Sequence, residues 1–192
     1  MVNTGRRERR KLETRRRLDE IALRLFLEHG YDGVTVAQIA EAADISVATL
    51  FAHVPDGKEA LIFDDGSERR AGIAAAIEER ADDESVLDAL QRFFASRGPY
   101  ARELPAEHAP KRELIVTTPA LRSYARRLWH SCEPLLAPAL AKESGLAADD
   151  PRVRALARFV VEVPDLTGTA ADPMAALAGV FQVLRSGWHS EG

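Results

Sequence analysis

The sequence predicts an all-α fold, and three observations support this prediction. Alanine, the residue with the highest helix propensity, occupies 32 of the 192 positions. Alternating runs of Val, Ile and Thr, which are typical of strands, are almost absent. Apolar residues instead recur at spacings of three and four, as in the run Leu18, Ile21, Ala22, Leu25 and Phe26. With 46% hydrophobic and 29% charged residues, the chain can bury a substantial core.

Length, charge and cysteine content exclude several classes of protein. A chain of 192 residues corresponds to one ordinary domain or two small ones, which excludes a large multidomain enzyme. The net charge of −4 means that a nucleic acid or an anionic membrane would have to be met by a local basic patch. Cys132 is the single cysteine, so an internal disulfide is impossible. No apolar stretch approaches the ~18 residues of a membrane span or the ~7 to 15 of an export signal, so we expect a cytoplasmic protein.

The charges are distributed unevenly along the chain. Residues 1–17 carry eight basic and two acidic groups, which gives a net charge of +6. Residues 18–60 carry two basic and eight acidic groups, a net charge of −6, and residues 61–192 carry −4. We therefore expect a basic N-terminal arm over 1–17, a first domain over 18–60 and a second helical domain over 61–192.

The first two helices are marked by local signals. The first helix is expected to begin within the basic arm and to end near His29, where Gly30 supplies a C-terminal cap. The second is expected to begin after Thr35, because Gln38 three residues later completes a capping box.

A third, short helix is expected from Val47 to His53, with Ser46 as its N-cap. Only Asp44 and Ile45 separate this N-cap from the preceding helix, and aspartate tolerates the left-handed backbone that a tight turn requires. Two short helices joined in this way form a helix-turn-helix.

The rest of the chain is expected to form longer helices bounded by proline and glycine. Pro164 should kink or end its helix, and Asp172 with Pro173 should start the last one. The expected helices cover 58–81, with Gly66 and Gly72 as weak points, then 85–97, 101–117, 120–143, 151–169 and 173–187.

Residues 18–62 resemble the N-terminal DNA-binding domain of the TetR family of one-component transcriptional regulators. The similarity rests on elements that hold their order and spacing: ALRLF, Gly30–Tyr31, Thr35, Ile39–Ala40, Ser46, Thr49–Leu50–Phe51 and Lys58–Glu59. The resemblance implies an N-terminal three-helix helix-turn-helix domain followed by a helical ligand-binding and dimerisation domain. It also implies a DNA-binding protein that is not an enzyme and needs no cofactor.

The candidate DNA contacts follow from the third helix and its neighbours. Val47, Ala48 and Ala52 are small enough to approach base edges in the major groove and can contact thymine methyl groups. Thr35, Ser46 and Thr49 lie at helix N-termini, where hydroxyl and backbone N–H groups bind phosphates. Lys58 resembles the family's phosphate-contacting lysine, whereas Phe51 replaces a tyrosine that is common there. The remaining candidates are His53 at the end of the helix and Arg15 and Arg16 of the basic arm, for which a solvated tail is the alternative interpretation.

Polar and aromatic residues within the later helices are candidates for binding an effector. The expected partner is a small hydrophobic or amphipathic molecule held between helices. Each residue could instead serve packing or face solvent. The candidates are His108, Arg122, Tyr124, Trp129, His130, Arg158 and Glu162.

The last helix carries an apolar seam with spacings of three and four residues, which suits packing against another helix. In the family such a seam belongs to the dimer interface; the alternative is a face of the chain's own core. The seam consists of Met174, Leu177, Phe181, Leu184 and Trp188.

These features predict a homodimeric repressor that binds a near-palindromic operator and is released by an effector. A DNA-binding activator or architectural protein without an effector is one alternative. A helical enzyme using His130 or Glu162 is another, but no nucleophile, base and orienting group occur together in the sequence. Cys132 lies two residues from His130 and one from Glu133, so the three residues do not share one helix face, and no second Cys/His pair accompanies them; no metal site is therefore expected.

Overall fold

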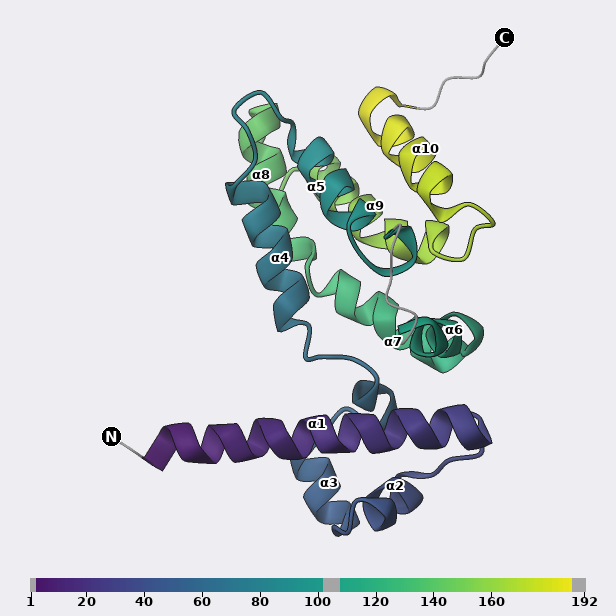
Figure 1. Ribbon diagram of the computed structural model, residues 1–192. Helices are drawn as coiled ribbons and strands as arrows, with labels where there is room; N and C mark the ends of the chain where they lie inside the picture. Colours follow the sequence, from purple (N-terminus) through teal and green to yellow (C-terminus); the bar gives the residue numbers. More distant parts are fainter. Residues whose placement is uncertain (1–2, 102–107, 188–192) are drawn as a thin grey trace. The chain divides into compact units, whose positions relative to one another are not determined.

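A computed structural model describes residues 3–101 and 108–187, and the regular secondary structure in these ranges is entirely helical (Figure 1). In chain order the elements are α1 (Asn3–His29), α2 (Val36–Ala42), α3 (Val47–His53), the 3₁₀ helix η1 (Lys58–Leu61), α4 (Ser67–Glu78), α5 (Val86–Ala95), the 3₁₀ helix η2 (Gly98–Tyr100), α6 (Ala109–Thr117), α7 (Pro119–His130), α8 (Glu133–Ser144), α9 (Pro151–Thr167) and α10 (Pro173–Ser186). The prediction of an all-α fold is confirmed.

The chain forms two compact units. The first lies within Met1–Asp65 and Glu107–Tyr124, and the second within Gly66–Ala106 and Ala125–Gly192. In the first unit α2, α3, η1 and α6 all contact α1. Among the described helices α1 is the longest (Figure 1). Thus α6 packs with the N-terminal helices although it follows them by more than forty residues in the sequence.

The core of the first unit forms from one stripe of α1 and the apolar faces of the short helices. Leu18, Ala22 and Phe26 recur every four residues on α1, and each is at most 1% exposed. Ile39 on α2 and Leu50 on α3 are fully buried as well. Because both short helices place their apolar side in this core, their opposite sides face solvent.

The local signals around α2 and α3 are confirmed. The Thr35 hydroxyl accepts a hydrogen bond from the Gln38 backbone N–H, and the Gln38 side chain accepts one from the Thr35 N–H, so the capping box is complete. The Ser46 hydroxyl caps α3 by accepting from the Thr49 N–H. Asp44 has φ 55° and makes the left-handed turn between the two helices. Gly30, with φ 76°, ends α1 directly after His29.

The predicted continuous helix over 58–81 is wrong. The chain forms the 3₁₀ turn η1, leaves helical geometry, and begins α4 at Ser67. Gly66, expected only to weaken the helix, is its break: it has φ 79° and precedes α4 as the N-cap. Ala60, Leu61 and Ile62 are buried in the first unit, so the break follows a segment that packs there.

The predicted helix over 120–143 is also wrong, because α7 ends at His130 and α8 begins at Glu133. Pro134 lies in the first turn of α8, where its missing N–H costs nothing, but it would interrupt a continuous helix. Pro164, by contrast, does not stop α9, which continues to Thr167. The helix expected over 101–117 appears as α6, and residues 102–107 lie outside the described part of the chain.

The second unit is a bundle in which α8 packs on α9, α4 on α5, and α10 on both α5 and α9 (Figure 1). Its core is rich in aromatic rings. Phe94 lies with its ring centroid 5.2 Å from that of Trp129 and 6.0 Å from that of Phe181. Tyr100 and Thr167, both buried, share a hydrogen bond of 2.6 Å between their hydroxyl oxygens. Within the described residues no helix is long and apolar enough to cross a membrane.

Candidate functional site

The solvent side of α3 presents small and apolar side chains. Ala48, Thr49 and Ala52 are exposed, and Val47 and Phe51 keep 40% and 43% of their surface accessible. Leu50 is fully buried and holds the helix against the first unit's core. The side chains of Ala48, Thr49 and Ala52 are short enough to let the helix backbone come close to the floor of a DNA major groove.

The hydroxyl groups predicted to contact phosphate lie at the starts of α2 and α3. The Ser46 and Thr49 hydroxyl oxygens are 2.8 Å apart and hydrogen-bonded to each other, and both residues are exposed. The exposed Thr35 hydroxyl donates to the Gln38 side-chain oxygen at 2.9 Å. His53 is half-buried, and its Nδ1 atom is buried without a hydrogen-bond partner among the described residues. That these groups contact DNA stays a prediction.

Arg15 points into the first unit. Its guanidinium donates to the backbone carbonyls of His53, Ala60 and Phe63 and forms an ion pair of 2.8 Å with Asp19. These bonds join α1 to the end of α3 and to η1, and they occupy the group that the sequence assigned to phosphate. Arg16 follows it on α1 with an exposed side chain. The structure therefore leaves Arg16 as the better candidate of the two for DNA contact.

Lys58 also makes contacts inside the unit. Its ammonium donates to the carbonyls of Tyr31 and Val34 at 2.9 and 3.0 Å and lies 3.9 Å from the centroid of the Tyr31 ring. The Tyr31 hydroxyl donates to Glu59 at 2.6 Å, and burial together with this bond raises the pKa of Tyr31. Of the three donors of a lysine, Lys58 thus uses two within the described part of this unit. A phosphate contact from Lys58 stays a prediction.

A partly buried charge cluster lies where α6 packs on α1. Burial raises the pKa of Asp19 to about 6, although the positive charges of Arg15 and Lys111 act in the opposite direction. Burial likewise lowers the pKa of Lys111, opposed by Asp19 and Asp64. The charged forms of both groups are therefore disfavoured in the folded protein.

The raised pKa of Asp19 predicts a pH-dependent effect of removing its charge. Between about pH 4 and about pH 6 the folded state holds a proton on Asp19 that the unfolded state has lost, so this group's contribution to stability falls as pH rises. The variant Asp19→Asn has no such dependence. Its free energy of unfolding should therefore rise relative to the natural chain across this window and level off above it. Urea unfolding of both proteins measures the difference, with the exposed neighbour Glu20→Gln as control; a difference that is constant with pH would refute the prediction.

The predicted effector-binding residues do not form one group. His108, Arg122 and Tyr124 belong to the first unit, where His108 and Arg122 are exposed. Tyr124 is buried and stacks on Phe63 with 5.4 Å between ring centroids. The other candidates, Trp129, His130, Arg158 and Glu162, belong to the second unit.

Three of these residues meet in an ion-pair network around Glu162. Arg126 donates to both Glu162 oxygens at 2.7 and 2.8 Å, and His130 Nε2 lies 2.9 Å from one of them without the alignment of a hydrogen bond. Arg158 lies 3.9 Å from Glu162 and pairs with Glu133 at 3.0 Å. The hydrogen bonds from Arg126 lower the pKa of Glu162. The sequence-based prediction missed Arg126, although its spacing of four residues from His130 places both on one face of α7.

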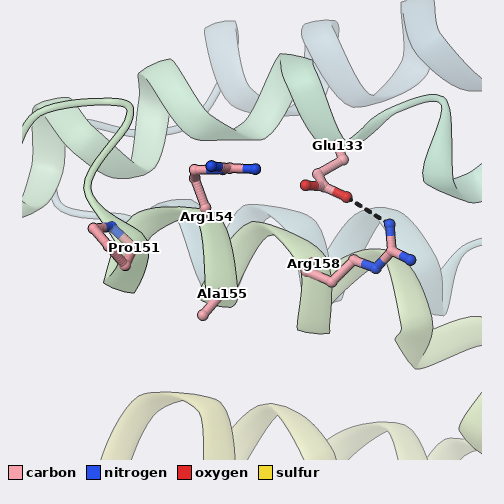
Figure 2. A pocket seen from close by; sticks show the side chains of 5 residues that line it. All are labelled: Glu133, Pro151, Arg154, Ala155 and Arg158. Carbon is pink, nitrogen blue, oxygen red and sulfur yellow. Dashed lines mark hydrogen bonds and ion pairs between the residues drawn. The ribbon is translucent and has the colours of Figure 1, made fainter.

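A shallow pocket of about 380 Å³ lies beside this network (Figure 2). Figure 2 shows the ion pair between Arg158 and Glu133 at one side of it, with Arg154 nearby. Arg158 is the only predicted effector residue that lines it; the lining is Glu133, Pro151, Arg154, Ala155 and Arg158. Because the charge of Arg158 is paired with Glu133, the pocket does not define the effector site.

The predicted dimer seam requires correction. Leu177 and Phe181 are 1% and 0% exposed and lie in the core of the second unit, so they pack within their own chain. Leu184 is half-buried against the same core, and Trp188 lies outside the described residues. Met174 is 41% exposed. The 3–4 spacing correctly indicated an apolar helix face, but tertiary packing turned that face inward.

Other large apolar residues of α9 and α10 are exposed, together with Met174 of the predicted seam. Phe159 and Leu166, seven residues apart on α9, are 58% and 64% exposed. On α10, which packs against α9, Met174 and Val183 are exposed as well. We call these four exposed residues the α9–α10 apolar surface; Phe159 and Leu166 share one side of α9, whereas Met174 and Val183, nine residues apart, lie on opposite sides of α10. Large exposed apolar groups are candidates for protein association.

Helices α1 to α3, of which α3 exposes small side chains, have the arrangement of a helix-turn-helix DNA-binding domain. Residues 20–64 match the family described as "Bacterial regulatory proteins, tetR family", and residues 84–186 match the family described as "MftR C-terminal domain". The chain belongs to the TetR family of bacterial transcriptional regulators, which bind DNA and are not enzymes.

The similarity extends to individual members. The chain is 32% identical over 152 residues to the HTH-type transcriptional regulator TcmR of Streptomyces glaucescens, covering 76% of this chain and 67% of TcmR. It is 26% identical over 145 residues, or 76% of this chain and 73% of the relative, to MftR of Mycobacterium tuberculosis, a transcriptional regulator assigned to mycofactocin biosynthesis. The solved structure of Salmonella enterica GusR has the same fold, with a TM-score of 0.56 at 19% identity, covering 92% of this chain and 95% of GusR.

Proposed function

We propose that the protein is a homodimeric repressor that binds a near-palindromic operator and releases it when an effector binds the second unit. The observation that supports DNA recognition most directly is the exposed face of α3, where Ala48 and Ala52 leave the helix backbone accessible beside exposed hydroxyl groups. Val47 and Phe51 add apolar surface for thymine methyl groups.

Electrostatic attraction to DNA is assigned to α1. The basic segment is not a loose tail: from Asn3 onward it is part of this helix. The basic side chains described as exposed within residues 3–17 are Arg9, Arg10, Lys11, Arg16 and Arg17. They can neutralise phosphates and so offset the net charge of −6 of residues 18–60, which include α3.

The α9–α10 apolar surface supports the proposal of a dimer. Most soluble oligomers are symmetric, and a two-fold dimer uses one surface patch on both subunits. Small exposed residues on α10, Ala175, Ala178 and Gly179, would let two such helices approach closely. Two subunits related in this way would present two α3 helices to successive half-sites about 34 to 36 Å apart or wider.

Footprinting the protein on the DNA upstream of its own gene tests this proposal. We expect protection of two half-sites related by a two-fold axis. The variant Leu166→Asp, which places a carboxylate in the α9–α10 apolar surface, should sediment as a monomer and lose at least about 100-fold in operator affinity, since each subunit would bind one half-site alone. Ala148→Asp, at an exposed site in the second unit, serves as control. A Leu166→Asp protein that stays dimeric, or a natural protein that protects one half-site only, would contradict the proposal.

A further inference from the structure

Two arginine side chains of the second unit lie close together, each over an aromatic ring. The guanidinium carbon of Arg69, on α4, is 4.6 Å from the centroid of the Trp129 ring. That of Arg97, which follows α5, is 3.7 Å from the centroid of the Phe93 ring. The Phe93 and Trp129 centroids are 6.5 Å apart, so both charges border one aromatic cluster.

The guanidinium of Arg97 is incompletely hydrogen-bonded within the described part of the chain. Its Nε atom is buried and has no hydrogen-bond acceptor there. The pKa of Arg97 is lowered, first because burial disfavours its charge and second because Arg69 repels it, while Glu68 acts weakly in the opposite direction. Burying a charge beside a like charge costs free energy, which an anion between the two groups would offset.

The position of Arg97 is constrained by its surroundings. A Cβ atom on Gly72 of α4 would lie 2.6 Å from Phe93 Cε2 and 3.3 Å from Arg97 Nη2. The glycine thus lets the Phe93 ring and the Arg97 guanidinium approach the α4 backbone. The arginine is held in place by packing on both sides, as a preorganised binding group would be.

We propose that Arg69 and Arg97 bind the carboxylate or phosphate of a small organic anion whose apolar part lies against Trp129. This inference rests on the proposed function, because the anion would be the effector of the second unit. A guanidinium donates hydrogen bonds in a planar array that matches the oxygen atoms of either group. The half-buried indole of Trp129 supplies the apolar surface next to them. The effector class expected from the sequence, a hydrophobic or amphipathic molecule, is thereby narrowed to an amphipathic anion.

Three probes that share one ring system test the charge requirement: 2-naphthoate, 2-naphthyl phosphate and the neutral 2-naphthol. We expect at least one of the two anions to bind the natural protein about 10-fold or more tightly than 2-naphthol in calorimetry. The stronger of the two identifies the preferred head group. Equal binding of all three probes, or binding of neither anion, overturns the proposal.

Variants test whether the two arginines cause the preference for an anion over 2-naphthol. Arg97→Met should weaken binding of the preferred anion by about 10- to 100-fold and leave 2-naphthol unchanged, and Arg69→Met provides a second, independent test. The control is Arg92→Met, five residues before Arg97 on α5, where the arginine is exposed and paired with Glu84. An anion preference that survives in both Arg97→Met and Arg69→Met overturns the proposal.

A stability measurement separates ligand binding from a structural role. Without ligand, Arg97→Met should unfold at a higher temperature than the natural protein, because it removes a partly buried charge that lacks an acceptor. A lower unfolding temperature would mean that the charge serves the fold, and would overturn the proposal.

Operator binding is measured on the same samples without probes. Operator binding with no anion preference refutes this inference alone. If the protein prefers the anions but does not bind its upstream DNA, the proposed repressor function is refuted and the proposed anion site is not.

Discussion

Replacing Ala48 with glutamate is expected to weaken operator binding by at least about 100-fold, because like charges facing each other across an interface cost several kcal/mol. Ala48 is exposed on α3, and its neighbours Val47 and Thr49 are exposed too. A carboxylate here would lie in the major groove close to the phosphates. The glutamate side chain is also longer than that of alanine and would keep the helix backbone away from the base edges. Electrophoretic mobility shift at low salt measures the loss.

The fold should not change in this variant, since position 48 contributes nothing to the core. Its thermal unfolding midpoint should match that of the natural chain. Ala148→Glu makes the same chemical change at an exposed position of the second unit and should bind the operator normally. An Ala48→Glu protein that binds DNA as tightly as this control would show that α3 is not the recognition helix.

Replacing Arg15 with methionine is expected to lower the free energy of unfolding by about 2 to 4 kcal/mol, which is the range for removing one partner of a largely buried, hydrogen-bonded charge. The change would leave the carbonyls of His53, Ala60 and Phe63 without their donor and Asp19 without its ion pair. Methionine keeps most of the apolar stem, so the loss reports mainly on the guanidinium. Urea unfolding measures it.

The adjacent Arg16→Met is the matched comparison, because it removes the same group from the exposed side of α1. Its stability should stay within about 0.5 kcal/mol of the natural chain. Its operator affinity should fall, and the slope of log affinity against log salt should become shallower by roughly one unit per subunit. If Arg15→Met were as stable as Arg16→Met, the carbonyl contacts of Arg15 would not support the first unit as described.

The candidate DNA-binding surface could be located from the sequence because its signals are local. A cap such as Thr35 or Ser46 acts on backbone N–H groups three residues away, and the turn at Asp44 depends on the backbone preference of one residue. Such interactions join residues that are only a few positions apart in the sequence. The ranges of α2 and α3 could therefore be read directly.

The second unit was harder to interpret, because its candidate sites depend on residues far apart in the sequence. Arg69 and Arg97 lie near each other through packing of α4 on α5, and both were missed. Glu162 of α9 contacts Arg126 and His130 of α7. The spacing of residues within α9 could not indicate these contacts. Gly66 was recognised as a weak point, but a helix break there became clear only from the burial of the preceding segment.

By itself, the sequence determined the all-helical class, the helix-turn-helix and the family resemblance, since these depend on propensity, periodicity and caps that act over three or four residues. Tertiary structure decided which side of each amphipathic element faces inward. It placed Arg15 inside and Arg16 outside, and it put Leu177 and Phe181 in the core while exposing Phe159 and Leu166. The physical reason is that burial depends on which distant segments cover a surface, and spacing along one helix carries no information about its neighbours.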